Sequence, residues 1–241
     1  MKLKIIRFLK ITFIRLRLHV IFSWLNPFFK EMIWMSDLSK WANKHGKIPI
    51  NDFPSEWNYE KRFGLYRQII VNESLDGPVN YLEFGVAGGA SFNWWMHQNT
   101  HPGSRFYGFD TFTGLPEDFG SYKKGTFASG NELPSITDSR GQFFQGLFQQ
   151  TLPGFLKTFD NSNKLIIMLD ADLYTATLFT LASLAPFLKK GDIILFDEFS
   201  VPTHEFKAFR EFCDTYYLNP ELIGAANNYY FTAFKVVNTL V

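Results

Sequence analysis

The sequence predicts an α/β fold: a doubly wound, mostly parallel sheet with a terminal antiparallel strand, preceded by an N-terminal helical extension. Two observations predict this class. From residue 79 onward, short apolar segments of strand length alternate with longer segments of helical periodicity. In addition, four predicted strands end in an acidic residue. Because the carboxyl ends of parallel strands lie along one edge of a sheet, we expect these acids to meet in one crevice. They are Glu83, Asp110, Asp170 and Asp197.

The elements follow one another in the order that such a sheet requires. Strands are expected at 79–84, 105–109, 142–148, 165–169, 192–196 and 229–237, and helices at 63–72, 90–98, 176–188 and 203–216. Thr203 is the expected N-cap of the last helix, because a threonine hydroxyl can accept a hydrogen bond from a first-turn N–H group. Residues 216–237 are expected to hold an antiparallel pair joined around Asn219 and Pro220.

Three regions are expected along the chain. Residues 1–30 form a basic amphipathic helix, residues 31–78 form an aromatic-rich helical cap that Pro49 and Pro54 interrupt, and residues 79–241 form the α/β domain. The single cysteine, Cys213, excludes an internal disulfide and fits a reducing compartment, so we expect a cytoplasmic protein.

The first 30 residues differ from the rest in charge. The chain has 24 basic and 23 acidic side chains, and this balance argues against a nucleic-acid-binding protein. Seven of the basic residues lie in the first 30 positions and no acid precedes Glu31, which leaves a formal charge of −6 on the remainder. Arg15 and Arg17 interrupt the apolar run, so neither a spanning helix nor a secretory signal is expected.

Two interpretations of residues 1–29 stay open. At 100° per residue, uncharged side chains gather on one side of a helix, as a helix lying on the inner, anionic face of a membrane requires. The same surface could pack on the domain or on a second subunit, which would give a homodimer. The side chains on the uncharged side are Ile5, Leu9, Thr12, Leu16 and Val20.

A glycine-rich turn follows the first predicted strand, between Tyr81 and Ser91. Glycine lets the backbone approach a ligand closely, and the following helix N-terminus offers unpaired N–H groups. The turn can therefore hold a polar cofactor. Its glycines, at 85, 88 and 89, do not follow the G-x-G-x-x-G spacing, and no Tyr-x-x-x-Lys pair is present, so a nicotinamide-dependent oxidoreductase is disfavoured.

Acidic side chains after the later strands predict both a ribose contact and a metal. Asp110, at the end of the second strand, is placed to accept hydrogen bonds from ribose hydroxyls. The long segment 111–140 that follows it has the composition and length of a lid or binding loop. Carboxylates clustered without basic neighbours would repel one another, and Mg²⁺ would relieve this repulsion. The carboxylates in question are Asp170, Asp172, Asp197 and Glu198.

Several motifs resemble those of class I S-adenosylmethionine-dependent methyltransferases, and in particular the macrocin and mycinamicin sugar O-methyltransferase family. Residues 81–86 (YLEFGV) resemble motif I of the class, and 107–117 (YGFDTFTGLPE) resemble the G-F-D-S-F-x-G-L-P-E signature of the family. Further similar segments occur at 146–153, at 169–177 and at 191–199, in the family's order. The resemblance identifies 79–241 as a class I methyltransferase domain with a Rossmann-like sheet.

The resemblance implies a role for each matching residue. The cofactor S-adenosyl-L-methionine would contact Glu83, Gly85, Val86, Gly88, Ser91, Asp110 and Phe112. Mg²⁺ would be held by Asp170, Asp197 and Glu198, and Asp172 would be the general base. Glu198 departs from the family pattern, which has a second aspartate there, and its longer side chain could change metal preference.

We therefore expect a Mg²⁺-dependent O-methyltransferase acting on a sugar hydroxyl of a glycan, glycolipid or glycosylated natural product. With residues 1–29 at a membrane, a lipid-linked sugar would suit as acceptor. Two alternatives are a metal-independent methyltransferase, in which the acids only cap helices, and a non-catalytic scaffold subunit that binds the cofactor. Retention of activity in EDTA would favour the first alternative, and binding without turnover would favour the second.

Overall fold

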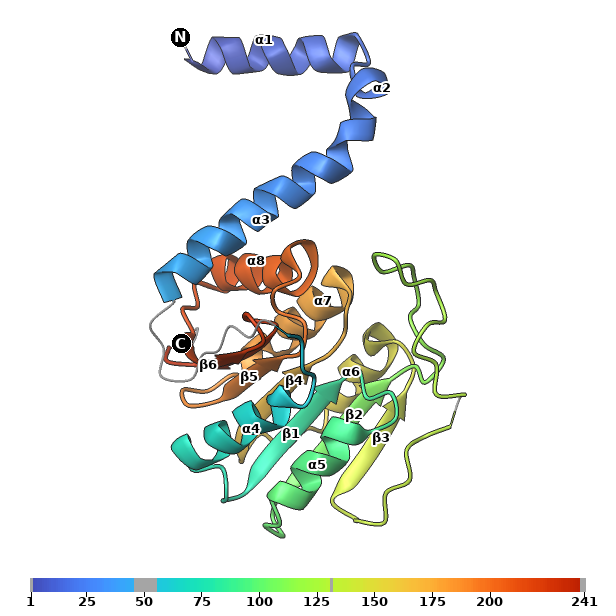
Figure 1. Ribbon diagram of the computed structural model, residues 1–241, viewed down its shortest axis with the longest axis vertical. Coiled ribbons are helices and arrows are strands. Elements are labelled where there is room, and N and C mark those ends of the chain that lie inside the picture. Colours follow the sequence, from blue (N-terminus) through green and yellow to red (C-terminus); the bar gives the residue numbers. More distant parts are fainter. Residues whose placement is uncertain (1, 46–55, 131, 239–241) are drawn as a thin grey trace.

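The computed structural model describes residues 2–45, 56–130 and 132–238, and it contains one seven-stranded sheet (Figure 1). The strand order is β3-β2-β1-β4-β5-β7-β6, with β1 to β5 parallel and β7 antiparallel to both β5 and β6. This confirms the predicted fold class. The strands are β1 Val79–Phe84, β2 Arg105–Asp110, β3 Gly141–Gln145, β4 Lys164–Leu169, β5 Ile193–Phe196, β6 Glu221–Ala226 and β7 Phe231–Lys235.

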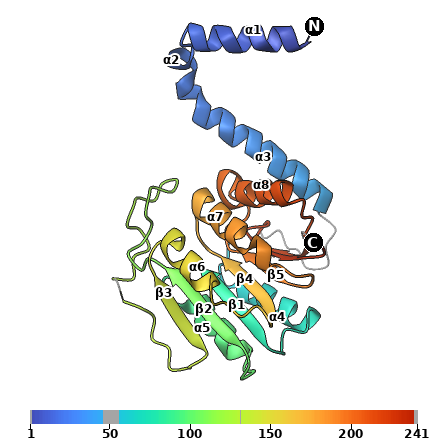
Figure 2. The ribbon, with the colours of Figure 1, turned by 180° about the vertical axis from the view of Figure 1, so that it is seen from behind.

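Helices cover both faces of this sheet (Figures 1 and 2). The helices α4 (Lys61–Asn72) and α5 (Ala90–Gln98) pack on one face, where Tyr66 and Trp95 are fully buried. The helices α6 (Phe148–Leu156), α7 (Tyr174–Leu184) and α8 (Lys207–Tyr216) pack on the other face. Side chains along a strand alternate between the two cores, as the period of two requires.

Much of the phenylalanine content lies in these cores. Phe84 of β1, Phe109 of β2 and Phe144 of β3 form a continuous stack across neighbouring strands, with ring centroids 4.8 Å apart at each step and interplanar angles of 10° and 11°. Offset stacking adds to the stabilisation that burial of each ring supplies. The stack joins β3 to β1, which leads into the glycine turn, and to β2, which ends at Asp110.

Two predicted boundaries are wrong for local reasons. The third strand ends at Gln145 rather than at residue 148, because Gly146 has a φ of +144° and α6 begins at Phe148. The Gln150 side chain accepts a hydrogen bond from the Leu147 N–H group, which fixes this helix start. The helix expected at 176–188 ends at Leu184, and a short 3₁₀ turn at Ala185–Phe187 accommodates Pro186.

The C-terminal part differs from prediction in two further places. Thr203 is not an N-cap: it lies inside a π-helical turn, Pro202–Phe206, that leads into α8, and its hydroxyl donates to Glu31. The antiparallel pair β6–β7 is joined at residues 227–230 and not around Asn219 and Pro220. Three consecutive residues of this turn have positive φ, which reverses the chain within four residues. They are Asn227, Asn228 and Tyr229.

The N-terminal segment forms several helices, of which α1 and α2 stand away from the domain (Figures 1 and 2). They are α1 (Lys2–Arg15), α2 (His19–Phe22), a 3₁₀ turn (Ser23–Leu25) and α3 (Asn26–His45). Arg17, with a φ of 51°, separates α1 from α2, so the single helix expected at 1–30 is divided. The helix α3 runs through residue 30, where we expected a division. Pro49 and Pro54 lie outside the described residues.

The C-terminal half of α3 anchors this segment to the domain. Trp41 is 7% exposed and packs against Phe199 and Tyr229, with ring centroids 4.9 and 5.5 Å away. Nearer its N-terminus, Trp34 contacts Phe206 edge to face at 6.2 Å. Among the described residues, no helix is both long and apolar enough to cross a membrane.

Candidate active site

The carboxyl ends of β1, β2, β4 and β5 meet at a cavity of about 1130 Å³. Strand register brings them together, since Phe84 pairs with Phe109 and Leu169, and Leu169 pairs with Phe196. The residue that follows each strand therefore enters the same space. Among the predicted site residues, the cavity is lined by Gly85, Asp110, Asp170, Asp172, Asp197 and Glu198.

The turn after β1 depends on glycine for space and for backbone conformation. Gly85 has a φ of +93°, and a Cβ atom there would lie 1.8 Å from the Asp170 carbonyl oxygen. Gly89, with a φ of +79°, is the N-cap of α5 and has no side chain to cap it. Ala87 is also held at positive φ. The predicted turn residue Gly88 is exposed, whereas Val86 is buried.

Glu83 lies beneath this turn rather than on the cavity wall. It is fully buried; Tyr81 donates to Oε2 over 2.5 Å and Ser91 donates to Oε1 over 2.6 Å. Burial raises the pKa of Glu83 to about 8, although the two hydroxyl donors oppose the rise. The structure therefore brings the predicted residues Glu83 and Ser91 into contact with each other, at the base of the glycine turn.

Asp110 ties the turn to the end of β2. Its Oδ2 atom accepts hydrogen bonds from the N–H groups of Val86 and Ala87 at 2.7 and 2.8 Å. Its Oδ1 atom accepts one from Phe112 N–H at 2.7 Å. Phe112 has a φ of 56° and is 1% exposed, so its ring fills the core while its backbone holds the carboxylate. One lone pair of Oδ1 is left for a further donor.

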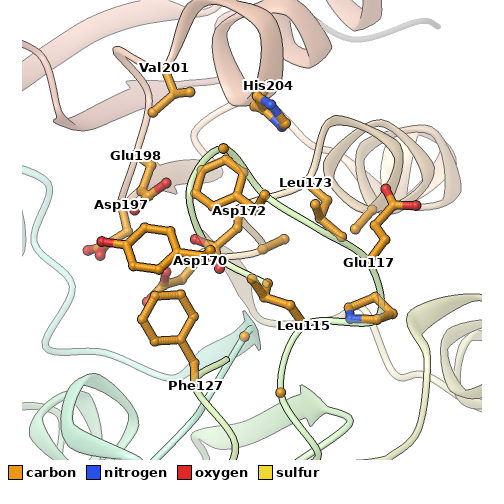
Figure 3. A pocket seen from close by; sticks show the side chains of 18 of the residues that line it. Leu115, Glu117, Phe127, Asp170, Asp172, Leu173, Asp197, Glu198, Val201 and His204 are labelled. Carbon is orange, nitrogen blue, oxygen red and sulfur yellow. The ribbon is translucent and has the colours of Figure 1, made fainter. Parts of the chain in front are cut away.

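The acidic residues after β4 and β5 form a cluster on one side of the cavity. Figure 3 shows Asp170, Asp172, Asp197 and Glu198 gathered there, with Leu173 and Glu117 on the opposite side. Asp172 has a φ of 57°, a strained conformation of the kind that is found at functional sites. Burial and the nearby charge of Glu198 raise the pKa of Asp172 to about 8.

Several partners of this cluster were missed by the sequence interpretation. Arg62 of α4 lies 3.5 Å from Asp197, so the expectation that the acids have no basic neighbour is wrong. Tyr66 donates to Asp197 over 3.4 Å, and Tyr230 donates to Glu198. These three partners lie 135, 131 and 32 residues away along the chain from the acids that they contact. An arginine in an aromatic-rich helix carries no sequence signal for such a contact.

The donor set fits a hard divalent cation. Two buried carboxylate oxygens, Glu198 Oε2 and Glu205 Oε1, have no hydrogen-bond partner among the described residues. Carboxylate oxygens are the ligands that Mg²⁺ prefers, together with water and substrate oxygens. In the described part of the chain, no three His, Cys, Asp or Glu side chains are already arranged to hold a metal ion. The cluster therefore supplies suitable donors without a preformed cage.

The first part of the predicted lid, residues 111–130, covers the cavity from the other side. Leu115 and Phe119 are buried with Leu173, and the Phe119 ring meets His204 edge to face at 4.8 Å. Leu115 N–H donates to Thr126 O, and Gly125 N–H donates to Leu115 O, which closes the segment on itself. These contacts place its side chains over the acids, as expected for a lid or binding loop. Tyr122 and Phe127 complete its aromatic wall.

A family model described as "Methyltransferase domain" matches residues 82–199. This range contains the glycine turn, Asp110 and the acidic cluster, and the sheet has the order and the antiparallel β7 of the class I fold. Residues 82–199 are a class I methyltransferase domain. A domain of this class uses S-adenosylmethionine, which confirms the predicted cofactor.

Solved structures show the same fold. The calicheamicin methyltransferase CalS11 is 22% identical with a TM-score of 0.56, and the alignment covers 85% of this chain and 92% of that one. The O-methyltransferase NovP is 16% identical with a TM-score of 0.55, covering 86% of this chain and 100% of that one. No curated protein matches the sequence.

Proposed function

We propose that this methyltransferase transfers a methyl group from S-adenosylmethionine to a sugar hydroxyl of a small-molecule acceptor, with Mg²⁺ bound at the acidic cluster. The observation that carries the proposal is the shared cavity. The glycine turn and Asp110 line one part of it, and the carboxylates after β4 and β5 line another. One cavity can therefore hold a methyl donor and a hydroxyl acceptor side by side, as an in-line displacement requires.

The chain's own residues would bind, orient and deprotonate the reactants. Asp110 would accept a hydrogen bond from a ribose hydroxyl at the free lone pair of Oδ1, while the backbone of Gly85, which lines the same cavity, would face the rest of the cofactor. Asp172 would take the proton of the acceptor hydroxyl as its oxygen forms a bond to the methyl carbon and the carbon–sulfur bond breaks. The lid side chains Leu115 and Phe119 would exclude water from this space.

The metal would be held by Asp170, Asp197 and Glu198. A bound Mg²⁺ supplies Lewis acidity, which lowers the pKa of an acceptor hydroxyl. Arg62 already neutralises part of the negative charge near Asp197, so we expect Asp170 and Glu198 to dominate metal affinity. The unpartnered Oε2 atom of Glu198 supports this assignment.

A sugar suits the remaining walls of the cavity. Aromatic rings can pack on the apolar face of a sugar ring, and Phe119, Tyr122 and Phe127 provide them. Glu31, Glu117 and His204 offer polar groups for its hydroxyls. A second CalS11 structure, 23% identical with a TM-score of 0.53 over 85% of this chain and 94% of that one, is titled TDP-rhamnose 3'-O-methyltransferase. That title makes nucleotide-activated deoxysugars the first acceptors to test.

Transfer of a labelled methyl group to a panel of nucleotide-activated deoxysugars tests the proposal. We expect an O-methylated product with the wild type and a rate at least about 100-fold lower with Asp172→Asn, which cannot accept the proton. Asp160→Asn, at an exposed position on the far end of the sheet, is the matched control and should keep full activity. Unchanged activity of Asp172→Asn would contradict the role of Asp172.

One observation favours a metal-independent methyltransferase as the second candidate. Asp197 already has Arg62 and Tyr66 as partners, so part of the cluster is neutralised without a metal. In that case the product would form at the same rate in EDTA.

The single cysteine, Cys213, is free and buried, in keeping with the cytoplasmic location that we infer for either enzyme.

A further inference from the structure

The N-terminal arm, defined as residues 2–35, leaves its apolar side chains uncovered. Of 26 exposed large apolar side chains in the described residues, 18 lie in this arm. The helix α1 buries no residue at all, and Phe8 is 68% exposed. Figures 1 and 2 both show α1 and α2 far from the sheet, joined to it only through α3. An apolar surface of this extent indicates a binding partner.

Charge on the arm indicates the kind of partner. At 100° per residue, α1 places Ile5, Phe8, Leu9 and Phe13 within one arc, which also holds Lys2. The opposite arc holds the other four basic side chains of α1, Lys4, Arg7, Lys10 and Arg15, together with Leu3, Ile11 and Ile14. No acidic residue precedes Glu31. A helix with one mainly apolar arc and with most of its basic side chains on the other side suits an interface between lipid tails and anionic headgroups.

Other occupants fit this surface less well. At 1.5 Å per residue, the 14 residues of α1 extend about 21 Å, less than the roughly 30 Å apolar core of a bilayer. A second copy of the arm would bring two sets of seven basic side chains together, and the one acid of each arm, Glu31, already accepts a hydrogen bond from Thr203. We propose that the arm lies on an anionic lipid bilayer and holds the enzyme at its surface.

The C-terminal end of the arm reaches the candidate active-site cavity. Glu31 lines that cavity and accepts a hydrogen bond from Thr203 over 3.2 Å. One turn later, Trp34 packs on Phe206, with Lys207 Nζ 5.9 Å above the Trp34 ring. A bilayer that binds the arm is therefore linked by one helix to the cavity wall. The consequence for the acceptor rests on the proposed function: the sugar that the enzyme methylates would be carried by a lipid of this bilayer.

Co-sedimentation of the full chain with vesicles tests the proposal. Vesicles of phosphatidylcholine with roughly 30% phosphatidylglycerol should bind the wild type, and pure phosphatidylcholine should bind it at least about tenfold more weakly. Raising salt to roughly 0.5 M should also weaken binding. The double variant Lys4→Glu/Lys10→Glu should lose binding by at least about tenfold, and Phe8→Ser/Leu9→Ser should weaken it too. Because these side chains are exposed, the thermal unfolding of the domain should not change.

The matched control is Lys157→Glu/Lys190→Glu, which makes the same charge change at two exposed positions of the domain. It should bind vesicles as the wild type does. An equal loss of vesicle binding in Lys4→Glu/Lys10→Glu and in Lys157→Glu/Lys190→Glu would overturn the proposal, because net charge alone would then explain binding. The proposal would also be overturned if the wild type did not bind vesicles and light scattering showed, without lipid, a dimer that Phe8→Ser/Leu9→Ser dissociates.

The two proposals fail separately. Vesicle binding is measured without acceptor, so an enzyme that binds vesicles but methylates no sugar contradicts only the proposed function. An enzyme that methylates a soluble sugar nucleotide but ignores anionic vesicles contradicts only the role of the arm.

Discussion

The Arg62 guanidinium lies 3.5 Å from both carboxylate oxygens of Asp197. Arg62 belongs to α4, outside the residues that match the methyltransferase family, whereas Asp197 follows β5 inside them. The Asp197 side chain is 4% exposed and that of Arg62 is 16% exposed, so the pair is largely shielded from water. A residue of the N-terminal cap therefore supplies positive charge to an acidic cluster that the domain itself provides.

Replacing Arg62 by methionine should destabilise the protein. It leaves Asp197 buried without its cation, and losing one partner of a buried pair costs about 3 kcal/mol. Mg²⁺ should recover more stability in Arg62→Met than in the wild type, because the cation replaces the lost charge. Thermal unfolding with and without Mg²⁺ measures both effects. Arg67→Met, on the same helix but exposed over the Trp94 ring, is the control and should cost less than about 1 kcal/mol. Equal losses in the two variants would contradict the account.

Glu83→Gln should change how stability depends on pH. The pKa of Glu83 is raised to about 8 in the folded protein, above the unfolded value of 4.5. Its contribution to stability is therefore complete below about pH 4.5 and is lost as the pH rises through 8. A glutamine side chain at this position cannot ionise, so the free energy of unfolding of the variant should rise by on the order of 4 kcal/mol relative to that of the wild type between pH 5 and pH 9.

Chemical denaturation at the two pH values measures this gain. The exposed Glu221→Gln serves as control and should follow the wild type at both. If the free energy of unfolding depended on pH in the same way for wild type and Glu83→Gln, the prediction would be wrong and Glu83 would ionise as an ordinary carboxyl does.

Asp110→Asn should weaken cofactor binding through two losses. An amide nitrogen cannot accept the N–H hydrogen bonds that hold the turn, and it cannot pair with a ribose hydroxyl as a carboxylate oxygen does. We expect S-adenosylmethionine affinity to fall about 30-fold, which corresponds to about 2 kcal/mol. Calorimetric titration measures it. Asp118→Asn, at an exposed loop acid paired with Lys123, should bind as the wild type does. Wild-type affinity in Asp110→Asn would remove Asp110 from the site.

Two glycines of the same turn should respond differently to alanine. Gly85→Ala places a Cβ atom 1.8 Å from the Asp170 carbonyl oxygen at a positive φ, so we expect a loss of at least about 3 kcal/mol. Gly88→Ala meets nothing within 4 Å and should keep nearly full stability. If Gly88 contacts the cofactor, its variant should still bind S-adenosylmethionine more weakly. Equal unfolding temperatures for the two variants would contradict the packing described here.

The sequence predicted the convergence of acids because strand register alone determines it. Once Asp170 and Asp197 follow neighbouring parallel strands, their proximity is fixed, and no long-range packing is needed. The position of Glu83 beneath the turn depended instead on its hydroxyl neighbours Tyr81 and Ser91. The contacts of Arg62 and Tyr230 arise from how α4 and the β6–β7 turn pack on the sheet, which periodicity does not reveal.

Thr203 shows the same limit at one residue. Its type and position before a helix favour an N-cap, but Thr203 lies inside a π-helical turn, where its hydroxyl donates to a glutamate 172 residues away. The packing of α3 on the Pro202–Phe206 turn brings that glutamate close. Tertiary packing, which also forms part of the cavity wall here, therefore overrides the N-capping propensity of Thr203.

Calorimetric titration of Mg²⁺ into the protein, in the presence of S-adenosylhomocysteine, distinguishes a metal-dependent enzyme from a metal-independent one. We expect one Mg²⁺ site per chain in the wild type, at least about tenfold weaker binding in Asp170→Asn, and unchanged binding in Asp160→Asn. We also expect that methyl transfer stops in EDTA and returns with Mg²⁺. Absence of Mg²⁺ binding, or equal affinity in wild type and Asp170→Asn with full activity in EDTA, would contradict the proposed metal dependence and establish a metal-independent enzyme.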